Sequence, residues 1–265
     1  MKDVNEKKLN KEVIFKLLPE FSNFSVNLEI FSEIGSTNSY LLNKDLQENK
    51  LSICLSEKQN LGRGRNGKIW QSPKNKNIYL SLSFITDLPV KKLEGFSLFV
   101  GLSISKAIKK LYSINALIKW PNDLFLNGKK FGGILIETKN IEGKILIVIG
   151  IGLNVLMEQN KFIDQSWTSI KIENRNLNID RNELVAAIVS ETMMNLEIFK
   201  LNGFKYFKKE FEYLHLLQNQ KVIASNYPDE KCIALNINND GSLNLKIGNK
   251  KYKVSSGEVS LKIQK

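Results

Sequence analysis

One short stretch of the sequence combines ammonium groups, a carboxylate and glycine, and these residue types together suit an anionic ligand. It reads KWPNDLFLNGKKFGGILIE and covers residues 119–137. Its polar members that could contact a ligand are Lys119, Asn122, Asp123, Lys129 and Lys130. Ammonium groups attract phosphate or carboxylate, and an aspartate beside them could hold a metal ion. The alternative is an ordinary solvated hairpin in a lysine-rich protein.

A β-hairpin is the element that would present these groups. Asn127-Gly128 is typical of a type I′ turn, and it lies between the apolar runs 124–126 and 134–136. Gly132-Gly133 lies inside the second run. Because a glycine pair weakens a strand, its presence indicates close approach of a ligand or of another chain segment.

Arginine is scarce, and its placement is the second chemical signal. The arginines among the 39 basic residues are Arg63, Arg65, Arg175 and Arg181. The first two lie one residue apart in GRGRNGKIW, residues 62–70. Their planar donor forks suit phosphate or carboxylate. We interpret 62–67 as a mobile loop that closes over an anion, with a flexible surface loop as the alternative. A Rossmann site is not predicted, because no helical period follows the G-x-G-x-x-G match.

Further polar groups lie where predicted strands end. A strand at 28–34 leads into Gly35-Ser36-Thr37-Asn38, whose side chains either cap the next helix or face a ligand. The apolar run 144–155 predicts a strand that is buried on both faces, and it contains the polar residue Asn154. The segment 157–167 is interpreted as a second mobile loop. Its Trp167 packs either against a flat ligand group or in the core.

The remaining periodic patterns predict a mixed sheet backed by helices and followed by a small β domain. Strands are expected at 51–56 and 78–86, and helices at 93–114, from Asp180 onward and at 204–217. From residue 220 the sequence changes to short strands with turn signals, which suggests a barrel of SH3-like size. We divide the chain into a short N-terminal extension (1–26), a catalytic domain (27–217) and a C-terminal β-barrel (218–265).

Composition excludes several classes of protein. The 265 residues are 42% hydrophobic, without an apolar run of the roughly 20 residues that cross a bilayer, and no signal peptide is visible, so we expect a cytoplasmic protein. The net charge of +12 is spread along the chain rather than gathered in a nucleic-acid-binding block. Cys54 and Cys232 are expected to be buried and unpaired. His215, the sole histidine, excludes a Ser-His-Asp triad and a multi-histidine metal site.

Three motifs together resemble the biotin protein ligases, also called biotin–acetyl-CoA-carboxylase ligases. They are GRGRNGKIW at 62–70, KWPNDLFLNGKKFGGILIE at 119–137 and GIGLN at 150–154, and the resemblance runs from about Ser32 to the C-terminus. It implies an α+β fold, in which a mixed β-sheet backed by helices, similar to class II synthetases, is followed by a small C-terminal SH3-like β-barrel.

The resemblance implies an ATP-dependent ligase. Such enzymes join biotin to ATP as biotinyl-5′-AMP, release pyrophosphate, and transfer biotin to one lysine of a biotin carboxyl carrier protein domain, here that of acetyl-CoA carboxylase. ATP and Mg²⁺ are the implied substrate and activating ion, biotin is the other substrate, and no prosthetic group is implied. No specific DNA or membrane partner is expected, and the oligomeric state, including a homodimer, is left open.

Matching motif by motif, the resemblance implies roles for individual residues. Those implied to bind biotin are Ser36, Thr37, Asn38, Gln59, Gly62, Arg63, Gly64, Arg65, Lys130, Gly132 and Gly133. Those implied to bind ATP are Arg65, Lys119, Asn122, Asn154 and Trp167. The implied catalytic residues are Lys130, Arg65 and Asp123, and Asp123 is also the candidate Mg²⁺ ligand. Lys130 matches the family's essential lysine, between the biotin carboxylate and the α-phosphate.

Two departures and two rivals qualify this assignment. Residues 1–26 are too short for the DNA-binding domain of relatives that act as repressors, so repression is not expected. Asn66 stands where many relatives are basic, which leaves open how firmly the adenylate is retained. A lipoate ligase shares the fold and chemistry, but the motifs argue against it. The high charge also fits a nonenzymatic nucleic-acid binder, which would shift DNA in a salt-sensitive way and release no pyrophosphate.

Overall fold

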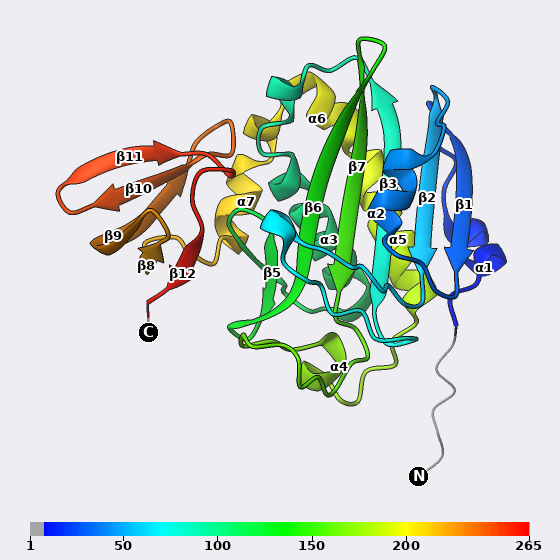
Figure 1. Ribbon diagram of the computed structural model, residues 1–265, viewed down its shortest axis with the longest axis horizontal. Helices are drawn as coiled ribbons and strands as arrows, with labels where there is room; N and C mark the ends of the chain where they lie inside the picture. The colour runs from blue at the N-terminus through cyan, green and yellow to red at the C-terminus, as the bar shows by residue number, and fades with distance from the viewer. Residues whose placement is uncertain (1–7, 265) are drawn as a thin grey trace.

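The computed structural model describes residues 8–264, and a seven-stranded mixed sheet is its largest element (Figure 1). Its strands lie in the order β1 (Ser25–Phe31), β2 (Lys50–Ser56), β3 (Ile78–Thr86), β7 (Lys144–Leu153), β6 (Lys129–Ile141), β5 (Asp123–Leu126) and β4 (Leu117–Lys119). β1 and β2 are parallel, and the other neighbouring pairs are antiparallel. The predicted mixed sheet is confirmed. The N-terminal extension predicted at 1–26 is described only from residue 8.

The predicted hairpin is also confirmed. Asn127 and Gly128 have φ values of 46° and 74°, as a type I′ turn requires. β6 continues beyond the glycine pair and pairs with β7 from Gly132 to Ile141. β7 is almost entirely buried, as its apolar run predicts. The hairpin therefore lies one strand in from the β4 edge, and its second strand, β6, pairs with the buried strand β7.

Helices cover both faces of this sheet. They are α1 (Lys11–Leu17), α2 (Thr37–Asn43), α3 (Phe96–Tyr112), α4 (Ile170–Glu173), α5 (Arg181–Met194), α6 (Leu196–Asn202) and α7 (Lys208–Leu214), with 3-10 turns η1 (Arg65–Gly67), η2 (Val90–Leu93) and η3 (Phe204–Tyr206). Figure 1 shows α3 and α5 behind the sheet and α2 in front of it. In the described chain, no helix combines the length and apolar character needed to cross a bilayer.

The continuous helix predicted at 204–217 is wrong, because the structure divides this segment into η3 and α7. α7 ends at Leu214, where His215 is extended and forms a parallel bridge with Ile118 of β4. The amide of Leu216 also donates to the carbonyl oxygen of Ile118 at 2.9 Å. These sheet contacts draw the chain out of the helix, and the local sequence pattern does not reveal them.

The C-terminal residues form a separate five-stranded antiparallel sheet. Its order is β11 (Lys250–Val254), β10 (Leu243–Ile247), β9 (Tyr227–Ile237), β8 (Lys221–Ala224) and β12 (Leu261–Ile263). The predicted turns at Asp240-Gly241 and Gly248-Asn249 join β9 to β10 and β10 to β11. This agrees with the predicted small β domain, and the boundary at residue 218 stays a prediction.

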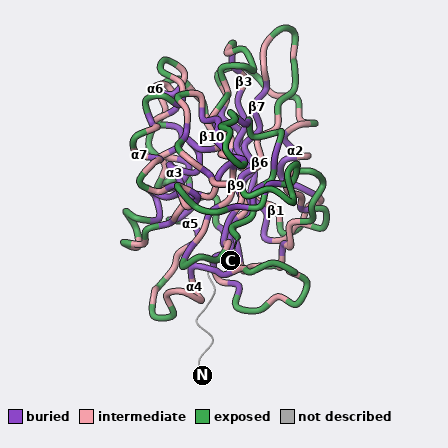
Figure 2. The backbone as a smooth tube through the Cα atoms, turned by 90° about the vertical axis from the view of Figure 1, so that its left-hand side faces the viewer, coloured by how far each residue is buried: buried purple, intermediate pink, exposed green. Residues whose placement is uncertain are grey.

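The two sheets share one apolar core, which follows the strands in Figure 2. The buried indole of Trp120, just after β4, donates a hydrogen bond of 3.0 Å to the carbonyl oxygen of Gly241. A Cβ on Gly241 would lie 2.5 Å from the Cα of Gly95, so backbone meets backbone there without space for a side chain. Trp120 therefore ties the KWPND stretch to the C-terminal sheet. Cys54 and Cys232 are buried and unpaired, as expected.

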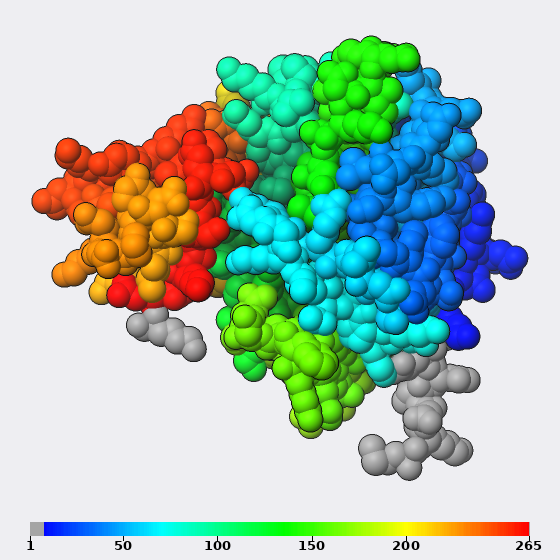
Figure 3. All heavy atoms as spheres, viewed as in Figure 1, coloured from blue at the N-terminus to red at the C-terminus, as the bar shows by residue number. Residues whose placement is uncertain are grey.

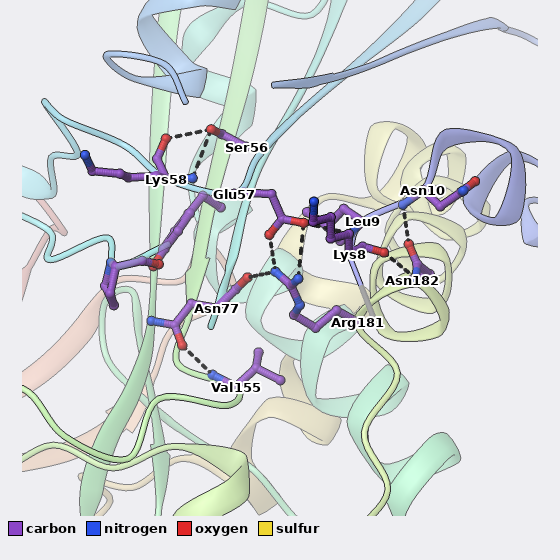
Figure 4. Close-up of polar contacts among 12 residues, drawn as sticks. Lys8, Leu9, Asn10, Ser56, Glu57, Lys58, Asn77, Val155, Arg181 and Asn182 are labelled. Carbon is purple, nitrogen blue, oxygen red and sulfur yellow. Dashed lines mark hydrogen bonds and ion pairs between the residues drawn. The ribbon is translucent and has the colours of Figure 1, made fainter. Parts of the chain in front are cut away.

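A buried ion pair joins four elements and the N-terminal segment (Figure 4). The guanidinium of Arg181, at the start of α5, donates to both carboxylate oxygens of Glu57 at 2.6 and 3.2 Å, and to the carbonyl oxygen of Asn77 at 3.0 Å. Glu57 also accepts from the amide of Leu9, and the side chain of Asn77 accepts from the amide of Val155. The pair thus lies at both ends of the segment 57–77, which contains the predicted loop 62–67, and Asn77 connects it to Val155, shortly before the second predicted loop, 157–167.

His215 predicts a loss of stability in mild acid. Both ring nitrogens are buried without a hydrogen-bond partner in the described chain, and burial lowers its pKa to about 4. The unfolded state, with a pKa near 6.5, binds the proton first as the pH falls, so stability is complete above about 6.5 and declines down to about 4. We expect a loss of about 2 kcal/mol between pH 7 and pH 5.

Urea unfolding at pH 7 and pH 5 measures this effect. The variant His215→Phe keeps a flat ring against Phe211 and does not titrate, so it should lose this part of the pH dependence. An unchanged pH dependence in the variant would show that other groups cause the decline.

Candidate active site

A cavity of about 620 Å³ lies between the two sheets and brings the sequence-predicted residues together. All of the residues proposed from the sequence line it except Gly62, Lys129 and Gly132. Figure 3 shows the glycine-arginine segment in cyan, between the C-terminal sheet and the blue N-terminal residues. β12 adds Leu261 and Lys262 to the wall, and Ser260 just before it also lines the cavity. A cavity of this size can hold a drug-sized ligand.

Gly62 and Gly132 serve packing in this structure. A Cβ on Gly132 would lie 2.6 Å from the Leu153 side chain and also crowd Leu124, so this glycine faces the core. A Cβ on Gly62 would lie 2.6 Å from the Ser72 hydroxyl. At Gly132 the close approach predicted for the glycine pair is therefore that of another chain segment, and Gly62 likewise packs against the chain.

The glycine-arginine loop, which we define as residues 60–70, is folded into a small hairpin. The amide of Trp70 donates to the carbonyl of Gly62 at 2.9 Å, and the amide of Gly64 donates to the carbonyl of Lys68 at 2.7 Å. Asn66, at the tip, has φ 55°, a left-handed value that asparagine adopts more readily than most residues. Asn66 therefore suits the backbone of the tip.

The two arginines of the loop contact different parts of the wall. Arg65 donates to the side-chain oxygen of Asn122 at 3.2 Å and to the carbonyl oxygen of Ser256 in the C-terminal region. Burial lowers the pKa of Arg65, and Asp123 acts in the opposite direction. Arg63 instead pairs with Glu137 of β6 at 2.6 Å. The guanidinium groups do not converge on one point.

Trp70 lies on the backbone of the central strands. Gly133 and Gly152 are cross-strand partners, and a Cβ on Gly152 would lie 2.6 Å from the Trp70 indole. The ammonium of Lys130 lies 5.6 Å from the centre of the ring. The indole nitrogen is buried and has no hydrogen-bond partner in the described chain. An unpaired donor in a cavity wall suits a ligand acceptor.

One end of the cavity is strongly basic. Lys130 and Lys119 lie 2.6 and 3.9 Å from the two carboxylate oxygens of Asp123, and all three side chains are at most 19% exposed. Burial lowers the pKa of Lys119; Asp123 opposes this shift, whereas Lys130, Lys68 and Lys262 reinforce it. A bound polyanion would relieve this repulsion.

The other end contains a network of amides and hydroxyls. The amide and hydroxyl of Thr37 lie 2.9 and 3.1 Å from Gln59 Oε1, and Ser81 Oγ lies 2.7 Å from Thr37 Oγ1 and 2.6 Å from Asn38 Oδ1. Thr37 and Ser81 have one hydroxyl proton each, so these two protons cannot supply all three contacts that their hydroxyl oxygens make. Ser36 caps α2, as one alternative predicted. The network can therefore accept a donor from a polar ligand ring.

The segment after β7 is tied to the hairpin. Lys130 forms a bridge with Trp167, and the amide of Thr168 donates to the carbonyl of Lys130 at 2.9 Å. The side chain of Asn154 donates to the carbonyl oxygen of Thr168 at 3.1 Å. Asn154 therefore holds the segment that carries Trp167, and both residues line the cavity.

Asp123 does not belong to a metal-binding cluster of protein groups. Residues 8–264 contain no group of three or more His, Cys, Asp or Glu side chains placed to hold a metal. One oxygen of Asp123 is already paired with Lys130. The donor set does not fit a resident metal ion. Magnesium commonly binds through one carboxylate together with substrate phosphates, so any Mg²⁺ here would arrive with its substrate.

The sequence of this chain matches a known family. The sequence model of the Biotin/lipoate A/B protein ligase family matches residues 31–154, and this part of the chain belongs to that family. Among solved structures, a biotin protein ligase from Aquifex aeolicus in complex with biotin and ATP superposes with a TM-score of 0.77 at 27% identity, covering 90% of this chain and 99% of that one.

Two relatives illustrate the extent of the similarity. The bifunctional ligase/repressor BirA of Escherichia coli is 33% identical over 199 residues, which are 74% of this chain and 61% of BirA. The biotin--[acetyl-CoA-carboxylase] ligase of Mycobacterium tuberculosis is 27% identical over 243 residues, which are 88% of each chain. This chain thus spans about three fifths of the length of the E. coli relative. The implied fold is confirmed, and residues 31–154 carry the domain of the implied family.

Some residues that line the cavity, or contact its lining, were not identified from the sequence. Trp70 belongs to the GRGRNGKIW motif, and that membership was the available signal. Glu137, which pairs with Arg63, carries a charge inside an apolar strand, and that contrast could have marked it. Lys262 had no local signal, because only the packing of the C-terminal sheet brings it to the cavity.

Proposed function

We propose that this protein is an ATP-dependent biotin ligase that forms biotinyl-5′-AMP and transfers biotin to a lysine of a carrier domain. One observation carries the proposal: a single cavity has a basic end around Asp123 and an amide-hydroxyl end around Thr37. The first suits phosphates and a carboxylate, and the second suits a polar ring. The biotin and ATP bound by the Aquifex relative support this assignment.

The proposed first step needs positioning and charge stabilisation. A biotin carboxylate oxygen attacks the α-phosphorus of ATP, a C–O–P linkage forms, and the bond to pyrophosphate breaks. Lys130, which already holds a carboxylate in the structure, binds the carboxylate and α-phosphate as charge moves between them. Lys119 and Arg65 offset the charge on the phosphates. Preorganised cations in a half-buried site supply most of such catalysis.

The second step needs an external nucleophile. The amine of the carrier lysine attacks the biotinyl carbonyl, an amide forms, AMP leaves and one proton is released. We propose that Asn154 and Trp167 contact the adenine and that Gln59 and Thr37 contact the biotin ring. Asn38, whose amide is engaged by Glu137 and Ser81, orients this end of the cavity.

Pyrophosphate release on adding biotin, ATP and Mg²⁺ tests the first step. Transfer of radiolabel from biotin to an isolated biotin carboxyl carrier domain tests the second. Lipoate in place of biotin should give no release above background. If pyrophosphate is released with lipoate but not with biotin, the enzyme is a lipoate ligase. If neither acid causes pyrophosphate release, the proposal is overturned.

Arg65→Ala is expected to loosen retention of the adenylate. Its guanidinium connects the loop tip to Asn122 and Ser256 and offers a charge-assisted hydrogen bond to the phosphate. Such bonds contribute about 1.5–3 kcal/mol, so the adenylate should dissociate roughly 10- to 100-fold faster. Release of radiolabelled adenylate from the purified complex measures this. Arg175→Ala, at an exposed arginine, is the control. Equal release from both variants would remove Arg65 from the site.

A further inference from the structure

Arg63 is held away from the basic end of the cavity by Glu137, which does not itself line the cavity. Arg63 Nη1 lies 2.6 Å from one carboxylate oxygen of Glu137, and Arg63 Nη2 donates to the Ser39 hydroxyl at 3.3 Å. The second carboxylate oxygen accepts from Asn38 at 2.9 Å. One carboxylate therefore joins the glycine-arginine loop to α2.

The two arginines anchor the loop at separate points along β6. Arg65 contacts Asn122, which is hydrogen-bonded to Ile134, whereas Arg63 contacts Glu137 three residues further on. At 3.3 Å per residue these points are about 10 Å apart. The loop is thus fastened at its tip by Arg65 and nearer its base by Arg63.

Asn38 can hold Glu137 because its own orientation is determined. Its Oδ1 faces the Ser81 hydroxyl, which donates a proton, and its Nδ2 faces the carboxylate of Glu137 and the carbonyl oxygen of Leu135. The reverse orientation would place three acceptors together. A Cβ on Gly150 would lie 2.4 Å from Asn38, so the strand backbone also confines this amide.

We propose that Glu137 is a positioning residue, which together with Asn38 holds Arg63 and keeps the glycine-arginine loop folded over the cavity before a ligand binds. The catalytic consequence rests on the proposed ligase function. A loop that is ordered in advance loses less conformational entropy when biotin binds, so biotin binds more tightly. The charge of Arg63 is then compensated by Glu137 rather than by the adenylate.

Limited trypsin digestion tests the positioning role without requiring activity. The loop contains three trypsin sites, Arg63, Arg65 and Lys68, and Glu137→Gln leaves all of them intact. The variant loses the charge-assisted bond, and glutamine has one oxygen in place of the two that accept separately from Arg63 and Asn38. We expect ligand-free Glu137→Gln to be cut in the loop about fivefold faster than wild type.

Glu29→Gln is the matched control. Glu29 pairs with Lys44 at a similar exposure, on β1 and away from the loop. In Glu29→Gln, trypsin should cut the glycine-arginine loop at the wild-type rate. Mass spectrometry separates cleavage at residues 63–68 from the scattered cleavage that global unfolding would cause. If Glu137→Gln does not fold, Glu137→Asp replaces it in the test, because aspartate keeps the charge but its shorter side chain reaches less far. Wild-type cleavage in the folded variant would overturn the proposal.

Biotin binding measured by calorimetry extends the test to function. Glu137→Gln and Arg63→Gln should each raise the biotin dissociation constant about fivefold, with the ATP constant unchanged, and the double variant should lose no more than either alone. If the losses of biotin affinity in the two single variants multiplied in the double variant, the two residues would act separately, and this would contradict the proposal. Faster loop cleavage in a protein that makes no biotinyl-AMP would support the positioning role while rejecting the ligase function.

Discussion

Lys130→Ala is expected to abolish biotinyl-5′-AMP synthesis, with a loss of about 10³-fold or more. Lys130 is the side chain that pairs with Asp123 at 2.6 Å and lies beside the Trp70 ring, where carboxylate and phosphate would meet. Its ammonium is preorganised for the charge that develops as pyrophosphate leaves, and removing one such group commonly costs 10²–10³. The variant also leaves the Asp123 carboxylate in place to repel both substrates.

Lys129→Ala is the matched control for this prediction. Lys129 is the preceding residue on β6, its side chain is half exposed, and it faces Glu173 at 4.0 Å rather than the cavity. Initial rates of pyrophosphate release should be close to wild type in Lys129→Ala. If Lys130→Ala released pyrophosphate as fast as its neighbour, the assignment of Lys130 as the reacting-centre lysine would fail.

Arg181→Met is expected to destabilise the fold by about 3–5 kcal/mol, because it leaves the buried carboxylate of Glu57 without its ionic partner. The Arg181 side chain is 1% exposed and donates to both oxygens of Glu57 and to the carbonyl of Asn77. Methionine fills much of the same volume, so the loss reports the charge more than a cavity. Equilibrium urea unfolding at pH 7 measures it.

A second substitution separates the ion pair from simple packing. Arg181→Met combined with Glu57→Leu removes both charges, and the double variant should recover part of the lost stability. Arg175→Met, at an exposed arginine, should change stability by no more than about 0.5 kcal/mol. If the double variant were less stable than Arg181→Met alone, the buried carboxylate of Glu57 would not be destabilising without Arg181, which would contradict this prediction.

Local sequence patterns were sufficient to predict the elements whose neighbours are close in sequence. Asn127-Gly128 predicted its hairpin because the turn conformation depends on those two residues. The alternating pattern of β3 and the apolar run of β7 each predicted a strand, and both strands are almost entirely buried. The motifs predicted most of the cavity wall, since they bring together residues from one end of the sheet.

Contacts between residues far apart in the sequence caused the differences between the predictions and the structure. Arg181 was seen as a helix-start residue beside Asp180, and nothing near it in sequence indicated a carboxylate 124 residues earlier. The break at His215 came from its pairing with Ile118. Gly132 looked equivalent to Gly133, but alternate residues of a strand face opposite sides, so only Gly133 reached the cavity. Each of these outcomes depends on a partner that the local pattern does not identify.

The part that β12 plays in the wall bears on how the protein is made. Lys262 and Ser36 line the same cavity, so the wall is complete only after β12 has been made and has packed. Ligands stabilise only chains that can bind them. A ligand that needs the complete wall therefore stabilises only chains in which β12 is already in place.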